Sequence, residues 1–183
     1  MTTITQTEQA LPVGTWNVDP VHSQVGFAVD YMVGTFHGTF SPIEAKLEGA
    51  EDGTATLTGR APVTGINVQD ENLAAHLQSP EFFDAERTPE ITFRSTEIRR
   101  DGDRVEVDGE LAIKGHALPV ELEGTITDPA DDPFGNVRVG LDLSTTIDRT
   151  AFGIEWNNPL PNGEPALANK VTLTANLYFV KEQ

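Results

Sequence analysis

The sequence has no cysteine among its 183 residues. This absence excludes disulfide bonds, thiolate zinc sites, iron–sulfur clusters and a cysteine nucleophile. Basic residues are also few, with 12 Lys and Arg against 29 Asp and Glu, which gives a formal net charge of −17. A negative field of that size repels phosphate backbones and anionic lipid headgroups. We therefore expect no nucleic-acid partner.

Long apolar runs are absent as well. The apolar stretches are short, such as residues 25–29, whereas a spanning helix needs about 20 residues, so we expect no stable membrane insertion. Residues 1–9 have neither the basic start nor the apolar segment of a secretory signal. We expect a cytoplasmic protein with a flexible polar tail over residues 1–12 and a single domain over residues 13–183.

The main pattern in the chain is alternation of apolar and polar residues. Val25, Phe27 and Val29 alternate with polar or small residues, as is typical of a strand with one buried and one solvated face. The same period recurs along most of the sequence. It predicts about eight strands, over residues 21–31, 34–48, 53–68, 90–100, 103–114, 117–127, 136–147 and 169–181.

Short turns separate these segments. Asp101-Gly102 predicts a type I′ hairpin turn, and Gly115-His116 and Asp52-Gly53 mark two further tight connections. Consecutive long strands joined by short turns favour a closed barrel, which leaves no unpaired edge. The sequence predicts an all-β fold, an eight-stranded antiparallel up-and-down barrel.

Two segments break the alternation. Between Asp70 and Pro89 the apolar spacing is helical, with Asp70 as the N-cap of one short helix and Ser79-Pro80 at the start of a second. We expect short helices near residues 70–85. Residues 150–168 are longer than an ordinary loop and predict an ordered lid or binding loop.

Six sequence blocks resemble the YceI-like family, which is also described as polyisoprenoid-binding and lipocalin-like. They lie in order along almost the whole domain. The blocks are GTWNVDPVHSQVGF at 14–27, FHGTF at 36–40, HLQSPEFFD at 76–84, PEITFRS at 89–95, GELAIKG at 109–115 and DRTAFGI at 148–154. The sequence departs from the family at Tyr31, where relatives usually have a histidine.

This resemblance implies a lipocalin-like barrel whose apolar interior holds the long tail of an isoprenoid lipid or a quinone-like molecule. It implies non-enzymatic carriage or storage, with no cofactor other than such a bound molecule. The ligand-binding residues that we predict are Phe27, Val29, Tyr31, Phe36, Phe40, Leu77, Phe82, Phe83, Phe93, Leu111, Ile113, Leu122, Leu141, Leu143, Arg149, Phe152 and Trp156.

Some of these residues have more specific expected roles. Arg149 is our candidate for binding a polar headgroup, and an ion pair with Asp148 or a neighbouring acidic residue is the alternative. Lys114 is a weaker candidate for the same role. Trp156 is predicted to lie at the entrance, and Phe82-Phe83 either cap the barrel mouth or seal the core.

Catalytic and metal motifs are missing. The four histidines show no i, i+4 or His-x-His zinc spacing, and the chain has no Gly-x-Ser-x-Gly sequence. We therefore predict no catalytic residue and no metal site. Alternation alone does not distinguish a hollow barrel from a packed one. Two alternatives stay open: an enzyme or stress-response protein acting on a small metabolite, and a packed scaffold that forms a homodimer through an exposed sheet face.

Overall fold

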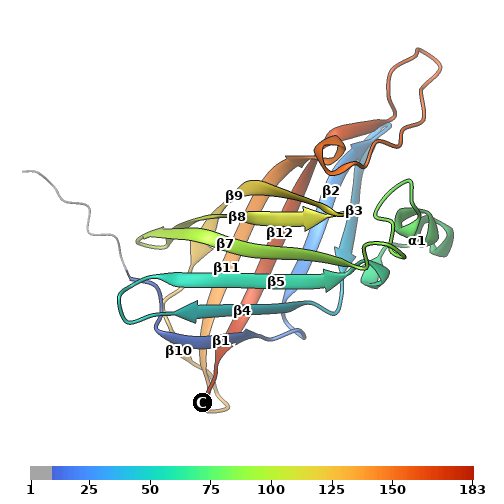
Figure 1. Ribbon diagram of the computed structural model, residues 1–183. Coiled ribbons are helices and arrows are strands. Elements are labelled where there is room, and N and C mark those ends of the chain that lie inside the picture. The colour runs from blue at the N-terminus through green and yellow to red at the C-terminus, as the bar shows by residue number, and fades with distance from the viewer. Residues whose placement is uncertain (1–9) are drawn as a thin grey trace, which may run out of the picture.

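The computed structural model describes residues 10–183, in which one continuous sheet contains all the strands (Figure 1). The strands are β1 Gly14–Val18, β2 Gln24–Tyr31, β3 Gly34–Phe40, β4 Glu44–Gly49, β5 Ala55–Pro62, β6 Ile66–Asn67, β7 Glu90–Asp101, β8 Arg104–Ile113, β9 His116–Ile126, β10 Ala130–Asp131, β11 Val137–Asp148 and β12 Leu167–Lys181. The helices are α1 Glu71–Gln78 and the short 3-10 turns η1 Val63–Gly65 and η2 Arg149–Phe152.

The sheet closes on itself through its last strand. β12 pairs with β11 from Asp148↔Lys170 to Arg138↔Val180, and its other edge pairs with β2 and then with β1. The closed ring is β11-β9-β8-β7-β5-β4-β1-β12, and every pairing is antiparallel. In Figure 1, β4, β5 and β7 cross steeply in front of β11 and β12. The predicted eight-stranded antiparallel barrel is confirmed.

Two of the expected strands are bent and divided. The segment predicted at 34–48 is β3 and β4, separated at Ser41-Pro42, because Pro42 has no N–H to donate to the sheet. The chain before residue 21 also contains a strand, β1, which we did not predict. β1 pairs with β4 at one end of the barrel, and β2 pairs with β3 at the other. The chain therefore bends twice, between β1 and β2 and between β3 and β4, and both bends follow the curved wall of the barrel.

The segment predicted at 53–68 is divided too. It forms β5, then η1, and then the two-residue strand β6, which pairs with β3. At η1, the N–H of Ser41 donates to the carbonyl oxygen of Gly65 at 3.0 Å. A Cβ atom on Gly65 would lie 2.0 Å from the Ser41 oxygen. This close approach requires glycine and fixes where the strand ends.

The hairpin turns differ in type from the prediction. Asp101 pairs with Arg104, so the two turn residues are Gly102 and Asp103, and only Gly102 has a positive φ, +62°. That pattern is typical of type II′ rather than the predicted type I′. At the β8–β9 hairpin both turn residues, Lys114 and Gly115, have positive φ, of 52° and 75°. The type I′ pattern occurs there.

One of the two expected helices is present. Asp70 caps α1 as predicted, because its carboxylate accepts from the N–H of Leu73 at 3.0 Å. The second helix is not formed. Ser79 is the C-cap of α1 instead, since its hydroxyl and its N–H both donate to the carbonyl oxygen of His76. Asp84, with φ of +55°, then interrupts any helical continuation.

The two ends of the barrel differ in packing. We call the end that carries β1 the floor, and the end that carries α1 and residues 153–166 the mouth (Figure 1). At the floor, Trp16 and Phe179 are 1% and 0% exposed, and Leu47 and Val139 are equally buried. Leu11 and Pro12, within the expected tail, are also buried, so the packed domain extends back to Leu11.

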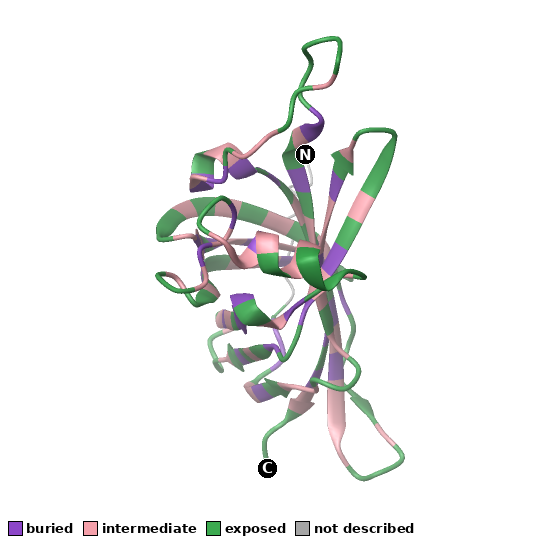
Figure 2. Ribbon diagram, turned by 90° about the vertical axis from the view of Figure 1, so that its right-hand side faces the viewer, coloured by how far each residue is buried: buried purple, intermediate pink, exposed green. Residues whose placement is uncertain are grey.

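Figure 2 shows buried and exposed residues alternating along the strands, as expected for a wall with one inner and one outer face. Among residues 10–183, no helix has the length and apolar character to cross a bilayer.

Candidate functional site

An apolar cavity of about 290 Å³ lies at the mouth end of the barrel, and we call it the upper chamber. Its walls are the inner faces of β2, β3, β5, β7, β8, β11 and β12, and its cover consists of α1, the 79–83 turn and the loop after η2. Thirteen of the residues predicted to bind a ligand line it: Phe27, Val29, Tyr31, Phe36, Phe40, Leu77, Phe82, Phe83, Leu111, Ile113, Arg149, Phe152 and Trp156.

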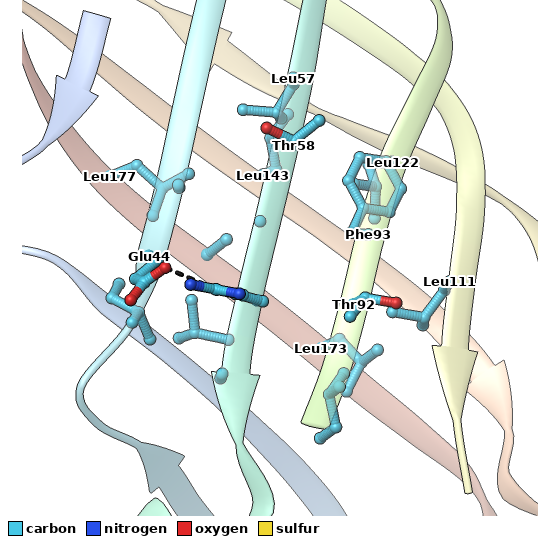
Figure 3. Close-up of a pocket in the computed structure, with 18 of the residues that line it drawn as sticks. Glu44, Leu57, Thr58, Thr92, Phe93, Leu111, Leu122, Leu143, Leu173 and Leu177 are labelled. Carbon is cyan, nitrogen blue, oxygen red and sulfur yellow. Dashed lines mark hydrogen bonds and ion pairs between the residues drawn. The ribbon is translucent and has the colours of Figure 1, made fainter. Parts of the chain in front are cut away.

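A second cavity of about 140 Å³, the lower chamber, lies closer to the floor. Figure 3 shows the lower chamber with Leu57, Leu143 and Leu173 from three different strands arranged around it. Among the predicted ligand-binding residues, Phe93, Leu122 and Leu143 line this chamber, and Leu111 lines both chambers. Leu141 lines neither, because it is buried in the packed region next to the floor.

The two chambers share part of their lining. Val25, Ala61, Ile91, Leu111 and Leu173 line both, and we call this set the waist. Because the same side chains lie on both cavities, the chambers adjoin inside the barrel, and we call the two together the lumen. The lumen begins under the mouth and ends above the floor.

The burial pattern also indicates a hollow interior. On β9, Leu118, Val120 and Leu122 occupy the inner face, yet each is only half-buried, while the alternate residues are exposed. Leu173 and Ala175 on β12 show the same intermediate burial. In a filled barrel these inner positions would be fully buried like Phe179.

Sequence reasoning missed several wall residues. Leu73, Ile147, Val171 and Leu173 belong to the same apolar patterns as the predicted residues, so the pattern could have identified them. His76 and Ile154 also line the upper chamber, but they come from α1 and from the loop. Period-two alternation gives no signal for either.

An aromatic cluster joins the three parts of the mouth. His76 on α1, Phe82 on the following turn and Trp156 on the long loop have ring centroids 5.0 to 5.3 Å apart. The His76 ring meets both Phe82 and Trp156 edge-on, at interplanar angles of 88° and 89°. Such arrangements are worth about 0.5–1.5 kcal/mol each beyond the area they bury. The cluster therefore fastens the helix to the loop over the upper chamber.

Arg149 fastens the other side of the loop. Its side chain is buried, and the guanidinium donates to the carbonyl oxygens of Ile154 (2.8 Å), Trp156 (2.8 Å), Ala168 (2.9 Å) and Leu167 (3.3 Å), and to Oδ1 of Asn169 (3.4 Å). Burial lowers the pKa of Arg149 below its usual value. The alternative ion pair with Asp148 is not formed, because that carboxylate accepts from the N–H and hydroxyl of Thr150.

Lys114, the weaker candidate for a headgroup contact, has a similar position. Its ammonium group donates to the carbonyl oxygens of Pro80 at 2.6 Å and Gly153 at 3.1 Å. Both cations thus hold loop carbonyls at the mouth. For either to bind a headgroup, it would have to exchange one of these contacts.

Tyr31 is the predicted residue best placed to contact a polar group. It lies at the end of β2, lines the upper chamber and is partly exposed. Its hydroxyl forms no hydrogen bond with any residue of 10–183. A ligand oxygen at the mouth can therefore pair with it without displacing a protein contact.

Acidic and histidine side chains are scattered over the barrel. Within the part of the chain that the structure describes, no three His, Asp or Glu side chains come together in a group that could hold a metal ion. His76 contacts Glu81 at 3.2 Å at the rim. The chambers themselves have mainly hydrocarbon surfaces, suited to burying an apolar molecule.

Known proteins share this architecture. BcnA from Burkholderia cenocepacia superposes with a TM-score of 0.76 at 22% identity, over 88% of this chain and 98% of that one. A polyisoprenoid binding domain from Saccharophagus degradans, implicated in plant cell wall breakdown, gives 0.62 at 12% identity, over 91% and 98% of the two chains.

Sequence comparison is more specific. A UPF0312 protein of Staphylococcus epidermidis is 31% identical over 171 residues, which cover 90% of this chain and 96% of the relative. Protein YceI of Escherichia coli O157:H7 is 29% identical over 142 residues, covering 73% and 72%. The family model of the YceI-like domain matches residues 16–179. The chain therefore belongs to the YceI-like family.

Proposed function

We propose that this protein binds an apolar, isoprenoid-type molecule in its lumen and carries or stores it without chemical change. The observation that carries the proposal is the pair of adjoining apolar chambers, of about 290 and 140 Å³, inside a barrel with a packed floor. The likeness to a polyisoprenoid binding domain of the same architecture supports it.

Energetics favour such a ligand. Burying hydrocarbon is worth about 0.8 kcal/mol per methylene relative to water, so the walls need no specific polar contact to bind a chain of several units. In a cell the competing environment is the bilayer, which is equally apolar. A protein that offers a similar environment exchanges its ligand by small free-energy differences, as a carrier or store requires.

The polar groups near the lumen support binding rather than catalysis. Arg149 and Lys114 are engaged by loop carbonyls, and His76 is paired with Glu81 at the rim. General acid–base chemistry needs a titratable group within hydrogen-bond reach of the reacting atom. The inward side chains of the chamber walls are mainly aliphatic and aromatic.

The two tryptophans provide the test. Trp156 lines the upper chamber, whereas Trp16 is buried in the floor. We expect farnesol to change tryptophan emission in the wild type and to leave the emission of Trp156→Phe unchanged, with binding of both proteins checked by native mass spectrometry. An organic extract of natively purified protein should contain a prenyl compound. If no prenyl compound is extracted and farnesol does not bind, the proposal is wrong.

A further inference from the structure

The length of the lumen limits the ligand. Resting on the proposed function, we infer that this protein takes a prenyl compound of three to four isoprene units, with its polar end at Tyr31 and its apolar tip in the lower chamber. A longer tail would leave its excess outside the mouth. The inference rests on three features: the chamber volumes, the closed floor and the waist.

The volumes set the number of carbon atoms. A cavity of about 150 Å³ accommodates one benzene molecule, with its six carbons. On that scale the upper chamber of about 290 Å³ holds about 12 carbons and the lower chamber of about 140 Å³ holds about six. Together they fit a chain of about 15 to 20 carbons.

The floor prevents further extension. Leu177, Leu143 and Ala45 line the lower chamber, and the next inward positions toward the floor are Phe179, Leu141 and Leu47. These three residues are 0%, 2% and 1% exposed. Since the side chains beyond the lower chamber are fully buried, the lumen does not continue through the floor.

One member of the waist, Ala61, has a small side chain. Ala61 pairs directly with Ile91 and lines both chambers. The next inward-facing residue of β5 toward the floor is Gly59, which pairs with Phe93 and lines the lower chamber. A Cβ atom on Gly59 would meet only the oxygen of Glu44 at 3.6 Å and Cβ of Ala45 at 3.9 Å. There is therefore space for a larger side chain that fills the lower chamber.

The orientation follows from the distribution of polar atoms. The hydroxyl of Tyr31 lies at the mouth end and has no bonding partner among residues 10–183. The polar residues around the lower chamber, such as Thr92 and Arg60, alternate with the inward residues of their strands and belong to the outer face. A tail that enters tip first thus keeps its polar end where it can be solvated.

A length series tests the inference on the wild-type protein. Geraniol, farnesol, geranylgeraniol and solanesol carry two, three, four and nine isoprene units, and each is delivered from the same nonionic detergent. We expect affinity to rise about tenfold or more per unit up to geranylgeraniol, because each added unit is buried. Solanesol should bind no more tightly than geranylgeraniol, since its extra units lie outside the lumen.

A chamber-filling variant makes the test specific. In Gly59→Leu, geraniol should bind as in the wild type, while affinity for geranylgeraniol should fall about tenfold or more. Thr56→Leu places a leucine on the outer face of the same strand and should bind every probe normally. If Gly59→Leu does not fold, Ala175→Val fills the same chamber from β12.

The outcomes separate the two proposals. If no prenyl alcohol binds the wild type, the proposed function fails. If solanesol binds much more tightly than geranylgeraniol, or if Gly59→Leu weakens all probes equally, the length limit is wrong while the binding function stands.

Discussion

The guanidinium of Arg149 donates to the carbonyl oxygen of Trp156 at 2.8 Å, so the residue that directly follows β11 holds the aromatic residue that covers the upper chamber. The same side chain bonds to the loop at Ile154 and to the start of β12. Arg149 is thus a buried cation whose partners are backbone and amide oxygens, and its bonds fix the position of the loop at the mouth.

We predict that Arg149→Lys is strongly destabilising although it keeps the charge. A lysine cannot reproduce the planar fork, and the loss leaves several buried carbonyls unpaired, at a cost of about 2–4 kcal/mol. Urea denaturation measures the change in the free energy of unfolding. Lys114→Gln removes a partly exposed contact at the same mouth and should cost less than about 1 kcal/mol. An equal decrease in the free energy of unfolding in the two variants would contradict this role of Arg149.

Removing the aromatic cluster should speed ligand exchange. Trp156→Ala loses two ring contacts, with His76 and Phe82, each worth about 0.5–1.5 kcal/mol. We therefore expect release of a bound prenyl alcohol to accelerate by about tenfold, as measured by transfer to acceptor vesicles of neutral lipid. Trp156→Phe keeps an aromatic ring and should release at close to the wild-type rate. An unchanged rate in Trp156→Ala would show that the cluster does not control exit.

The barrel could be predicted from the sequence because alternation reports which side of a wall each residue occupies. The bends could not, since the alternation continues across them. Pro42 was the available signal for the division between β3 and β4. The turn between β1 and β2, by contrast, depends on contacts with β11 and β12 that only the closed barrel provides.

For the same reason, the lining of the chambers could be predicted only in part. Leu141 and Leu143 share one face of β11, and their alternation is identical, yet Leu143 lines the lower chamber and Leu141 is packed near the floor. Alternation gives the side of the sheet but not the height within the barrel. Height is set by strand register, such as Leu143↔Gly124, which becomes known only when distant strands pair.

Acidic pH should weaken the ion pairs that Arg138 on β11 forms with Asp19 and Asp132. We call this group the clasp, because it holds the β1–β2 turn against β11. Arg138 bonds to Asp19 at 2.9 Å and to Asp132 at 2.6 Å. The Arg138 bond holds the pKa of Asp19 far below its usual value, with further help from His22, and lowers the pKa of Asp132 to about 2. Because both pKa values are depressed in the folded state, this stability is present above about pH 4, the unfolded value. It is lost as the pH falls through about 2.

Urea denaturation at several pH values between 7 and 2 measures this effect. The free energy of unfolding should decline as the pH falls below about 4, and Arg138→Gln should make that decline shallower, since neither carboxyl then has its cationic partner. Arg60→Gln removes an exposed arginine on β5 that pairs with Glu44 and leaves the clasp intact. A decline equally steep in the wild type and in Arg138→Gln would contradict the assignment.

The pairing between β9 and β11, which we call the β9–β11 seam, should depend on one glycine for its stability. These strands pair over only a short stretch, from Leu141↔Ile126 to Ser144↔Glu123, and Gly124 lies within it. A Cβ atom at Gly124 would lie 1.7 Å from the carbonyl oxygen of Asp142. Relieving that overlap requires the two backbones to separate, so Gly124→Ala should lose about 2–4 kcal/mol of stability.

Gly59→Ala is the matched control for this prediction, because it adds the same methyl group to another strand where the nearest atom is 3.6 Å away. It should be neutral or stabilising by about 0.5 kcal/mol, since alanine restricts the unfolded chain more than glycine does. Thermal and urea denaturation of both variants, measured side by side, give the comparison. A Gly124→Ala protein as stable as Gly59→Ala would mean that the β9–β11 seam is looser than the close backbone approach at Gly124 requires.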